Sequence, residues 1–278
     1  MNVLFCGNDK VFDGMLTVML SIFKRTASKA PINFYIFTMD VSHLKSAYLP
    51  LSDEQANYLS EVAKTYNENH QVTKIDVTNL YMQTFSQCPN ENAYCSPYTL
   101  IRLLADKVEA IPDKILYLDI DIMFNRDITL LYDIDINDYE YAAARDHYGK
   151  VLVHPNYVNA GVLLLNMKKI RETGLFRKAC KLLQEKKLVF ADQSALIRST
   201  TKKKMLSQRF NDQKFLHKKT IIRHFSKRLF YLPYPHTDNI KQWHVQKVHK
   251  VFKYYQFDDI YEDYFYYKKI FEMKKGAL

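Results

Sequence analysis

The fold class of this 278-residue chain is decided by the stretch Lys114-Ile115-Leu116-Tyr117-Leu118-Asp119-Ile120-Asp121-Ile122-Met123. Its apolar and aromatic run predicts a strand buried on both faces that ends at two carboxylates. The first and third side chains of an extended segment point to the same side, so Asp119 and Asp121 can face one centre. Their charges repel each other, and a hard divalent cation such as Mg²⁺ or Mn²⁺ resolves that repulsion. The alternative is a solvated turn, where Asp is common; the strongly apolar strand favours a site.

Length, charge and composition limit the classes of protein that this chain can represent. The length fits one large α/β domain, or one domain with an appendage. The formal net charge of +10 predicts an anionic partner, such as nucleic acid, a phosphorylated small molecule or an acidic membrane surface. No signal peptide and no apolar run of about 18 residues is present, so we expect a cytoplasmic protein. The cysteines form no Cys-x-x-Cys pair and are expected to be free thiols: Cys6, Cys88, Cys95 and Cys180.

Upstream of the central stretch, strands and helices alternate. Strands are expected at 3–6, 32–37 and 72–77, helices at about 13–23 and 52–65, and a polar loop at 83–92. Asp13 is a candidate N-cap, and Ser52 with Gln55 has the spacing of a capping box. The order strand, turn, helix is the opening of a nucleotide-binding α/β unit. However, neither G-x-G-x-x-G nor a Walker lysine is present.

Downstream, further strands are expected at 141–146, 162–165 and 221–225, a helix beginning at Ser96, one helix over about 167–187, and a helical turn at 128–131. Arg102 lies among apolar residues of the Ser96 helix and is either a surface cation or a ligand contact. Asn159-Ala160-Gly161 precede an apolar strand, where small residues let the backbone approach a ligand. Asp192 is a candidate N-cap, and the last strand brings His224 to its end.

The segment from Lys241 onward has a different composition, because aromatic residues alternate there with lysines and carboxylates. One interpretation is one or two amphipathic helices packed on the domain. The other is an interfacial helix on anionic lipid, which combines aromatic side chains with basic charge. We expect one α/β domain over 1–245 and an aromatic, basic attachment region over 246–278.

Two carboxylates and a late histidine supply enough ligands to hold Mn²⁺ and leave coordination positions open for a diphosphate. In this order and spacing, the residues resemble family 8 glycosyltransferases, the retaining group that includes bacterial lipooligosaccharide α-galactosyltransferases. The resemblance is carried by Tyr98 to Arg102, by Lys114 to Asp121, by Asn159 to Asn166, and by Asp192-Gln193. It covers most of residues 1 to 245 and leaves the tail out.

The resemblance implies a GT-A fold, which is an α/β fold with a Rossmann-like, mixed and mostly parallel sheet flanked by helices, here followed by a short helical C-terminal region. It implies Mn²⁺ or Mg²⁺ bound by Asp119, Asp121 and His224. The implied contacts to a UDP-sugar come from Cys6, Asn8 and Asp9 at the uridine, Ile120 at the nucleotide, Arg102 and Asp146 at the donor sugar or diphosphate, and Asn159, Ala160 and Asp192 at sugar hydroxyls. Gln193 would lie beside the anomeric carbon, and its weakness as a nucleophile favours front-face attack.

The chain departs from the family pattern at three places. Ser194 stands where relatives often have an acid, and Asn8 also stands where an acid is common. A longer insertion follows His224, so the lysine that contacts the diphosphate is either Lys241, which we slightly favour, or Lys227. The implied activity is metal-dependent transfer of glucose or galactose to a glycan or lipid-linked acceptor, at the inner face of a bacterial membrane.

Two other classes compete with this interpretation. A haloacid-dehalogenase-type phosphatase also has Asp-x-Asp after an apolar strand, but near the start of its core and with Thr or Val where this chain has Met123. A non-catalytic nucleic-acid-binding protein would explain the positive charge and the basic aromatic tail. However, no recognisable nucleic-acid-binding motif is present.

Overall fold

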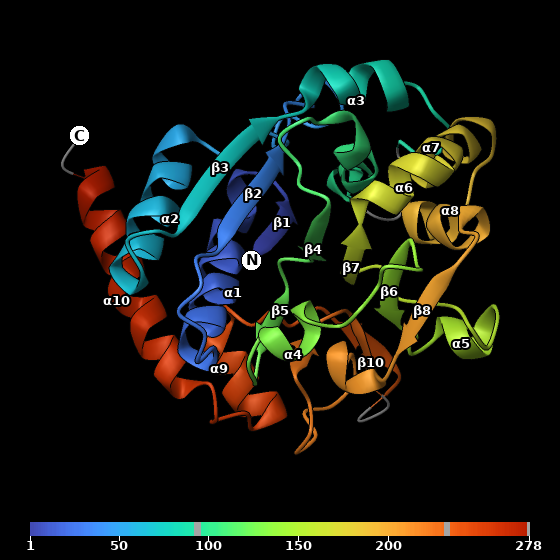
Figure 1. The fold of residues 1–278 in the computed structure, drawn as a ribbon. Helices are drawn as coiled ribbons and strands as arrows, with labels where there is room; N and C mark the ends of the chain where they lie inside the picture. Colours follow the sequence, from blue (N-terminus) through green and yellow to red (C-terminus); the bar gives the residue numbers. More distant parts are fainter. Residues whose placement is uncertain (92–95, 231–233, 277–278) are drawn as a thin grey trace.

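The computed structural model describes residues 1–91, 96–230 and 234–276; Cys95 lies outside them. Within these residues, the main sheet has the order β3-β2-β1-β4-β7-β6-β8 (Figure 1). Its strands are β1 (Asn2–Cys6), β2 (Asn33–Thr38), β3 (Gln71–Asp76), β4 (Lys114–Leu118), β6 (Tyr141–Ala144), β7 (Val162–Asn166) and β8 (Lys203–Leu206). Only β7 runs antiparallel to its neighbours β4 and β6. The mixed, mostly parallel sheet is therefore confirmed.

Helices cover both faces of this sheet (Figure 1). Successive residues of β1 point to opposite sides, so Val3 and Phe5 join one apolar core and Leu4 and Cys6 the other. The first core contains α1 (Phe12–Arg25), α2 (Asp53–Tyr66) and α10 (Asp258–Gly276). The second contains α3 (Thr78–Phe85), the 3₁₀ helix η2 (Pro97–Lys107), α6 (Met167–Thr173), α7 (Leu175–Glu185) and α8 (Ala191–Ser199).

The strand predicted to end at the two carboxylates is β4, and a second short strand follows them. β4 ends at Leu118, Asp119 to Asp121 form a turn, and β5 (Ile122–Phe124) leaves the main sheet. β5 pairs antiparallel with β9 (Ile222–His224), and Ile122 lies opposite His224. This pairing brings the late histidine back to the carboxyl end of β4.

Several predicted boundaries were wrong. Gly174 has a left-handed backbone (φ +68°) that ends α6, so the helix expected over 167–187 is two helices. The loop predicted over 83–92 begins later because α3 continues to Phe85, and the segment from Ser96 is a 3₁₀ rather than an α-helix. Asp13 and Asp192 lie inside the first turns of α1 and α8 and cap neither. The capping box at Ser52 is confirmed.

The remaining elements are short. They are η1 (Asp9–Val11), α4 (Thr129–Tyr132), α5 (Gly149–Leu152), η3 (Gln208–Phe210), β10 (Arg228–Phe230), β11 (His236–Asp238), α9 (Val245–Lys247) and the π-helical η4 (Val248–Phe252). The strand at 221–225 is thus not the last one, because the hairpin β10–β11 follows it. Its three-residue strands were too short to show a periodic pattern in the sequence.

The C-terminal helix α10 packs against α1 (Figure 1). Tyr264 and Phe271 are buried in the core that α1 forms, and Arg25 Nη1 lies 2.7 Å from Asp259 Oδ2. The tail therefore forms packed helical structure, the first of the two alternatives considered for it. Among the described residues, no helix has the length and apolar character needed to cross a bilayer.

Candidate active site

The turn after β4 and the end of β9 bring two carboxylates and one imidazole together. Ligand atoms of Asp119, Asp121 and His224 all lie within 4.8 Å of one another. The His224 Nε2 atom lies 3.1 Å from Asp121 Oδ1 and 3.8 Å from Asp119 Oδ2. Two oxygen ligands and one neutral imidazole nitrogen are a suitable set for Mn²⁺ or Mg²⁺.

The backbone around this cluster leaves room for no additional side-chain atom. A Cβ at Gly161 would lie 2.5 Å from His224 Cε1 and 2.6 Å from Asp119 Oδ2. Glycine at position 161 therefore lets the backbone just before β7 approach both predicted ligands, His224 and Asp119. The donor set and the close backbone approach fit a bound divalent cation.

Asn211 lies next to the cluster and is fully buried. Its Oδ1 lies 2.9 Å from His224 Nδ1, so a proton on Nδ1 would leave Nε2 as the free lone pair. Its Nδ2 donates to Asn159 Oδ1 at 2.8 Å, and Asn159 Nδ2 donates to Asp146 Oδ2 at 2.8 Å. One chain of hydrogen bonds therefore joins the predicted metal site to the predicted sugar site.

Arg102 is a buried cation, with 3% of its surface exposed, so the surface-cation alternative was wrong. Its guanidinium lies 3.3 Å from Asp192 Oδ2 and 3.4 Å from Asp119 Oδ1, and it donates to the Ala160 carbonyl. Tyr117 lies beneath it, with 4.1 Å between the guanidinium carbon and the ring centroid, and donates to Asp119 Oδ1 at 2.6 Å. Burial raises the pKa of Asp192, although Arg102 opposes the shift.

The carboxylate of Asp121 lies beside two nitrogen groups. Its Oδ2 accepts from the Lys241 ammonium, and its Oδ1 lies beside His224. Burial alone would raise the pKa of Asp121, but Lys241 and His224 hold it below its usual value. Of the two candidate lysines, Lys241 thus contacts the cluster, whereas Lys227 lies in the connection between β9 and β10.

A pocket of about 260 Å³ opens beside the carboxylates, at the carboxyl ends of β1 and β4. This edge is where open α/β sheets bind their ligands. Lining residues include the predicted contacts Cys6, Asn8, Ile120 and Lys241. Burial raises the pKa of the Cys6 thiol. Asp9 follows Asn8 directly, and its buried Oδ1 has no hydrogen-bond partner within the described chain.

The predicted sugar-side residues lie where β6 ends and β7 begins. Gln193 Oε1 accepts from the Ala160 backbone N–H at 3.0 Å, which orients its amide. Asp146 Oδ1 accepts from the backbone N–H of Gly149 at 2.6 Å. Ser194, which replaces the acid common in relatives, lies 2.7 Å from the Tyr157 hydroxyl and holds no charge at this position.

Two residues of this region were missed in the sequence. Tyr117 was assigned to the buried strand alone, although its hydroxyl reaches Asp119. Asn211 lies between Phe210 and Asp212, in a stretch without periodicity, so no sequence signal could have identified it. The contacts of Asn211 join residues far apart in the chain, whereas the Tyr117 hydroxyl reaches a residue only two positions away.

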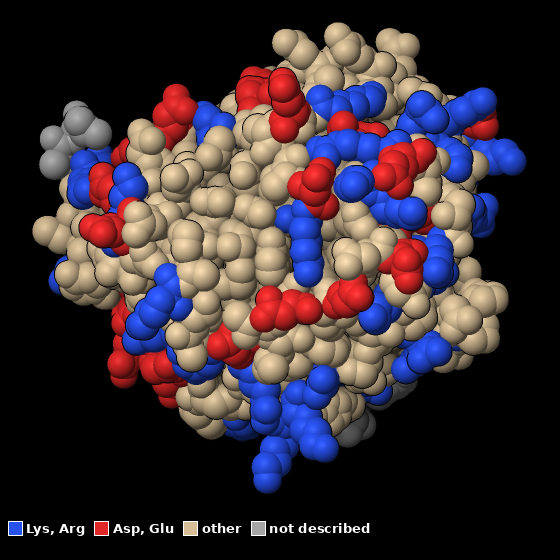
Figure 2. All heavy atoms as spheres, in the orientation of Figure 1, with Lys and Arg blue, Asp and Glu red and all other residues tan. Residues whose placement is uncertain are grey.

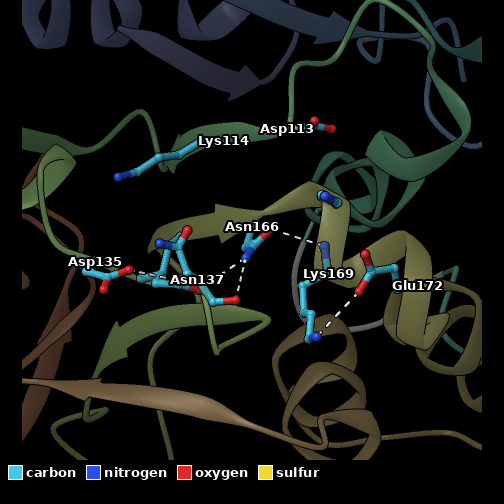
Figure 3. Close-up of a pocket in the computed structure, with 9 residues that line it drawn as sticks. Asp113, Lys114, Asp135, Asn137, Asn166, Lys169 and Glu172 are labelled. Atoms are coloured by element: carbon cyan, nitrogen blue, oxygen red, sulfur yellow. Dashed lines mark hydrogen bonds and ion pairs between the residues drawn. The ribbon is translucent and has the colours of Figure 1, made fainter.

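A second hollow, of about 560 Å³, lies at the opposite end of β4. Figure 3 shows several of its polar side chains pairing with neighbours: Lys169 Nζ lies 3.4 Å from Glu172, and Asn166 Nδ2 donates to the Ile136 carbonyl at 3.1 Å. None of the predicted site residues lines this hollow. The candidate active site is therefore the smaller pocket at Asp119 and Asp121.

A mostly parallel α/β sheet with an acidic cluster after a central strand defines the GT-A class of glycosyltransferases. A family model described as glycosyl transferase family 8 matches residues 2–244. The chain therefore belongs to glycosyl transferase family 8. The predicted class of enzyme is confirmed at this level, and membership excludes the phosphatase and the non-catalytic alternative.

Individual relatives agree with this assignment. A putative glycosyltransferase from Haemophilus influenzae is 27% identical over 239 residues, which are 80% of this chain and 67% of that protein. Glycosyltransferase GlyA from Streptococcus pneumoniae is 36% identical over 95 residues, which are 34% of this chain and 13% of that protein. The crystal structure of galactosyltransferase LgtC in complex with donor and acceptor sugar analogues matches with a TM-score of 0.65 and 21% identity, over 81% of this chain and 86% of that chain. This last similarity shows the shared GT-A fold.

Proposed function

We propose that this protein is a retaining hexosyltransferase that moves glucose or galactose from a UDP-sugar to a glycan or lipid-linked saccharide. The observation that carries the proposal is the convergence of Asp119, Asp121 and His224 beside the pocket lined by Cys6 and Asn8. Such an arrangement suits a diphosphate that bridges a metal ion and a nucleoside site. LgtC, which shares the fold, was crystallised with donor and acceptor sugar analogues.

In this proposal the uridine occupies the pocket between β1 and β4. The buried Asp9 Oδ1 lacks a partner among the described residues and is suited to accept a hydrogen bond from the base. Asn8 is buried at the pocket wall and offers both a donor and an acceptor. Ile120 supplies apolar contact between the two carboxylates.

Asp119, Asp121 and His224 would hold Mn²⁺ or Mg²⁺, which when bound supplies a Lewis-acid charge to the diphosphate. Lys241 adds a cation at the same place, because its ammonium already contacts Asp121. Arg102 keeps Asp119 and Asp192 oriented, since it contacts both from within the core. Asn159 and Asp192 then bind sugar hydroxyls, and Asp146 orients Asn159.

Gln193 is too weak a nucleophile to form a covalent intermediate, so we infer that the acceptor attacks the sugar directly. Its amide oxygen is fixed by the Ala160 N–H, so Gln193 positions the sugar and stabilises charge at the anomeric carbon. The acceptor hydroxyl attacks that carbon on the face from which UDP leaves. A new C–O bond forms, the bond to UDP breaks, and the hydroxyl proton passes to a phosphate oxygen. Retention of configuration follows.

The proposal is tested by measuring release of nucleoside diphosphate from UDP-glucose, UDP-galactose and GDP-mannose, with Mn²⁺ or with a chelator. We expect metal-dependent release of UDP from at least one UDP-hexose, lost in Asp119→Asn. The exposed-site variant Asp138→Asn serves as the matched control and should behave as wild type. Release from GDP-mannose alone, or equal release with the chelator, would contradict the proposal.

A further inference from the structure

The end of the short helix α5 and the residue after it present three consecutive aliphatic side chains to solvent. Val151, Leu152 and Val153 are 79%, 75% and 52% exposed. Adjacent large apolar side chains at such exposure are unusual on a soluble surface and mark an interaction site. Over α5, Figure 2 shows a projecting patch of uncharged atoms with Lys and Arg atoms beside it.

Hydrogen bonds and close packing hold α5 in place on the domain. Asp146 Oδ1 accepts from the backbone N–H groups of Tyr148 at 3.0 Å and Gly149 at 2.6 Å. A Cβ at Gly149 would lie 2.3 Å from the Tyr157 ring, so the turn is packed tightly on the domain. The apolar tip is thus held outward by the fold.

The surroundings of the tip are basic. Arg145, His147 and Lys150 line one hollow of about 110 Å³ with uncharged neighbours. The Tyr148 hydroxyl accepts from the Leu229 N–H of β10 at 3.4 Å, which joins α5 to a segment, residues 213–230, that contains no Asp or Glu.

The basic character continues along that segment. Arg228 lies over the half-exposed Phe215 ring at 5.0 Å, and Lys214 lies over the same ring at 5.3 Å. Between residues 145 and 156 the only acid is Asp146, whose two oxygens accept the hydrogen bonds of α5 and Asn159. An apolar tip within a cationic surround is complementary to one kind of partner, the headgroup and upper acyl region of an anionic bilayer.

The aromatic tail is less suited to this role. Helix α10 carries five acidic residues and four lysines, so it is not basic. Two of those lysines are already paired: Lys268 Nζ lies 2.9 Å from Asp13, and Lys274 Nζ lies 2.6 Å from Glu61. Phe265 and Tyr266 are exposed on this helix, whose acidic residues outnumber its lysines.

We propose that α5, with the cations around it, docks the protein on an anionic lipid surface. Asp146 holds α5 with one oxygen and Asn159 of the proposed sugar site with the other, so docking would place that site beside the membrane. This orientation toward a lipid-linked acceptor rests on the proposed function; binding to lipid does not.

The test is co-sedimentation of the full chain with vesicles of pure phosphatidylcholine, and with vesicles of equal parts phosphatidylcholine and phosphatidylglycerol. We expect binding only to the anionic vesicles, weakened about tenfold or more in Val151→Ser/Leu152→Ser, because two buried aliphatic contacts are lost. Lys150→Glu should also weaken binding and remove part of its salt dependence. The matched control, Phe265→Ser/Tyr266→Ser on α10, should bind as wild type.

Three results would overturn the proposal. They are wild-type binding by the α5 variants, loss of binding in the α10 control, and an apolar-dependent self-association of the wild type in gel filtration without lipid. UDP titration and the melting temperature of each variant, expected to match wild type, show that the fold is intact. A protein that binds anionic vesicles through α5 but releases no UDP would contradict the proposed function and leave the docking surface standing.

Discussion

Asn211 connects the predicted metal site to the predicted sugar site through two hydrogen bonds of one side chain. Its Oδ1 faces His224 Nδ1 and its Nδ2 reaches Asn159 Oδ1. Residues that orient a ligating histidine affect metal affinity although they do not touch the metal. Asn211 is therefore a positioning residue in our account.

Replacement of Asn211 by Ala tests this role. We expect Asn211→Ala to lower Mn²⁺ affinity about 10- to 100-fold, because the His224 ring loses the partner that fixes its orientation. Direct titration with Mn²⁺, followed by the paramagnetic resonance signal of free Mn²⁺, measures the change without any activity assay. The exposed Asn79→Ala on α3 is the control. Unchanged Mn²⁺ affinity in Asn211→Ala would show that the hydrogen bond is merely structural.

The candidate site residues had local signals in the sequence, whereas the residues that contact and orient them did not. Asp119 and Asp121 follow an apolar run, and His224 ends another, so both signals are local. Asn211 has no such signal, because its contacts arise only when β9 folds back on β5. Likewise, the burial of Arg102 depends on Asp192 and Ala160, which lie far along the chain.

At the scale of elements, Glu140 ties β6 to the turn before β8. The buried carboxylate accepts from Thr200 Oγ1 at 2.5 Å, from the Thr201 N–H at 2.8 Å and from the Lys202 N–H at 3.2 Å. Burial alone would raise the pKa of Glu140, but hydrogen bonds from Thr173, Thr200, Lys202 and Thr201 hold it below its usual value. The ionised form is therefore the one that stabilises the fold.

This gives a pH-dependent prediction. Glu140→Gln should lower the free energy of unfolding by roughly 1.5–3 kcal/mol at pH 7, because charge-assisted hydrogen bonds are lost. The wild-type advantage is complete above the pKa of the unfolded state and disappears as the pH falls through the lowered native pKa. Urea unfolding at pH 7 and at successively lower pH measures it, with the exposed Glu109→Gln as control. A difference independent of pH would contradict this account.

Elements were predicted wherever their periodicity was long. The Rossmann-like strands and helices α1 and α2 show clear patterns. Helix α3 buries Tyr81 and Phe85, together with Val77 just before it, a helical spacing that polar neighbours hid. The division of the helix expected over 167–187 depended on Gly174, whose left-handed backbone a helical pattern does not reveal. The short strands β10 and β11 gave too few residues for a period, whereas β9 lies within the strand expected at 221–225.

At the scale of the whole molecule, the tail helix α10 contributes to the same core as α1. Phe271 is buried, with ring centroids 4.5 Å from Phe12 and 5.0 Å from Tyr58. The family match ends at residue 244, so this packing lies outside the region shared with the family model. We infer that the tail stabilises the catalytic domain.

Phe271→Ala should therefore lower the free energy of unfolding by about 3–5 kcal/mol, the usual cost of removing a buried aromatic side chain. Thermal or urea unfolding measures this loss, and the transition should remain single. Met273→Ala, two residues away and 65% exposed, is the matched control and should change stability little. A loss as small as that of the control would show that α10 is held only loosely.

The central claim is that the two carboxylates after β4 hold a metal ion for a UDP-sugar. Calorimetric titration of UDP, with and without Mn²⁺, tests it most directly on wild type, Asp121→Asn and the exposed control Asp138→Asn. We predict Mn²⁺-dependent UDP binding in wild type and control, lost in Asp121→Asn, because one of the predicted metal ligands loses its charge. UDP binding that is equal with and without Mn²⁺, or unchanged in Asp121→Asn, would contradict the claim.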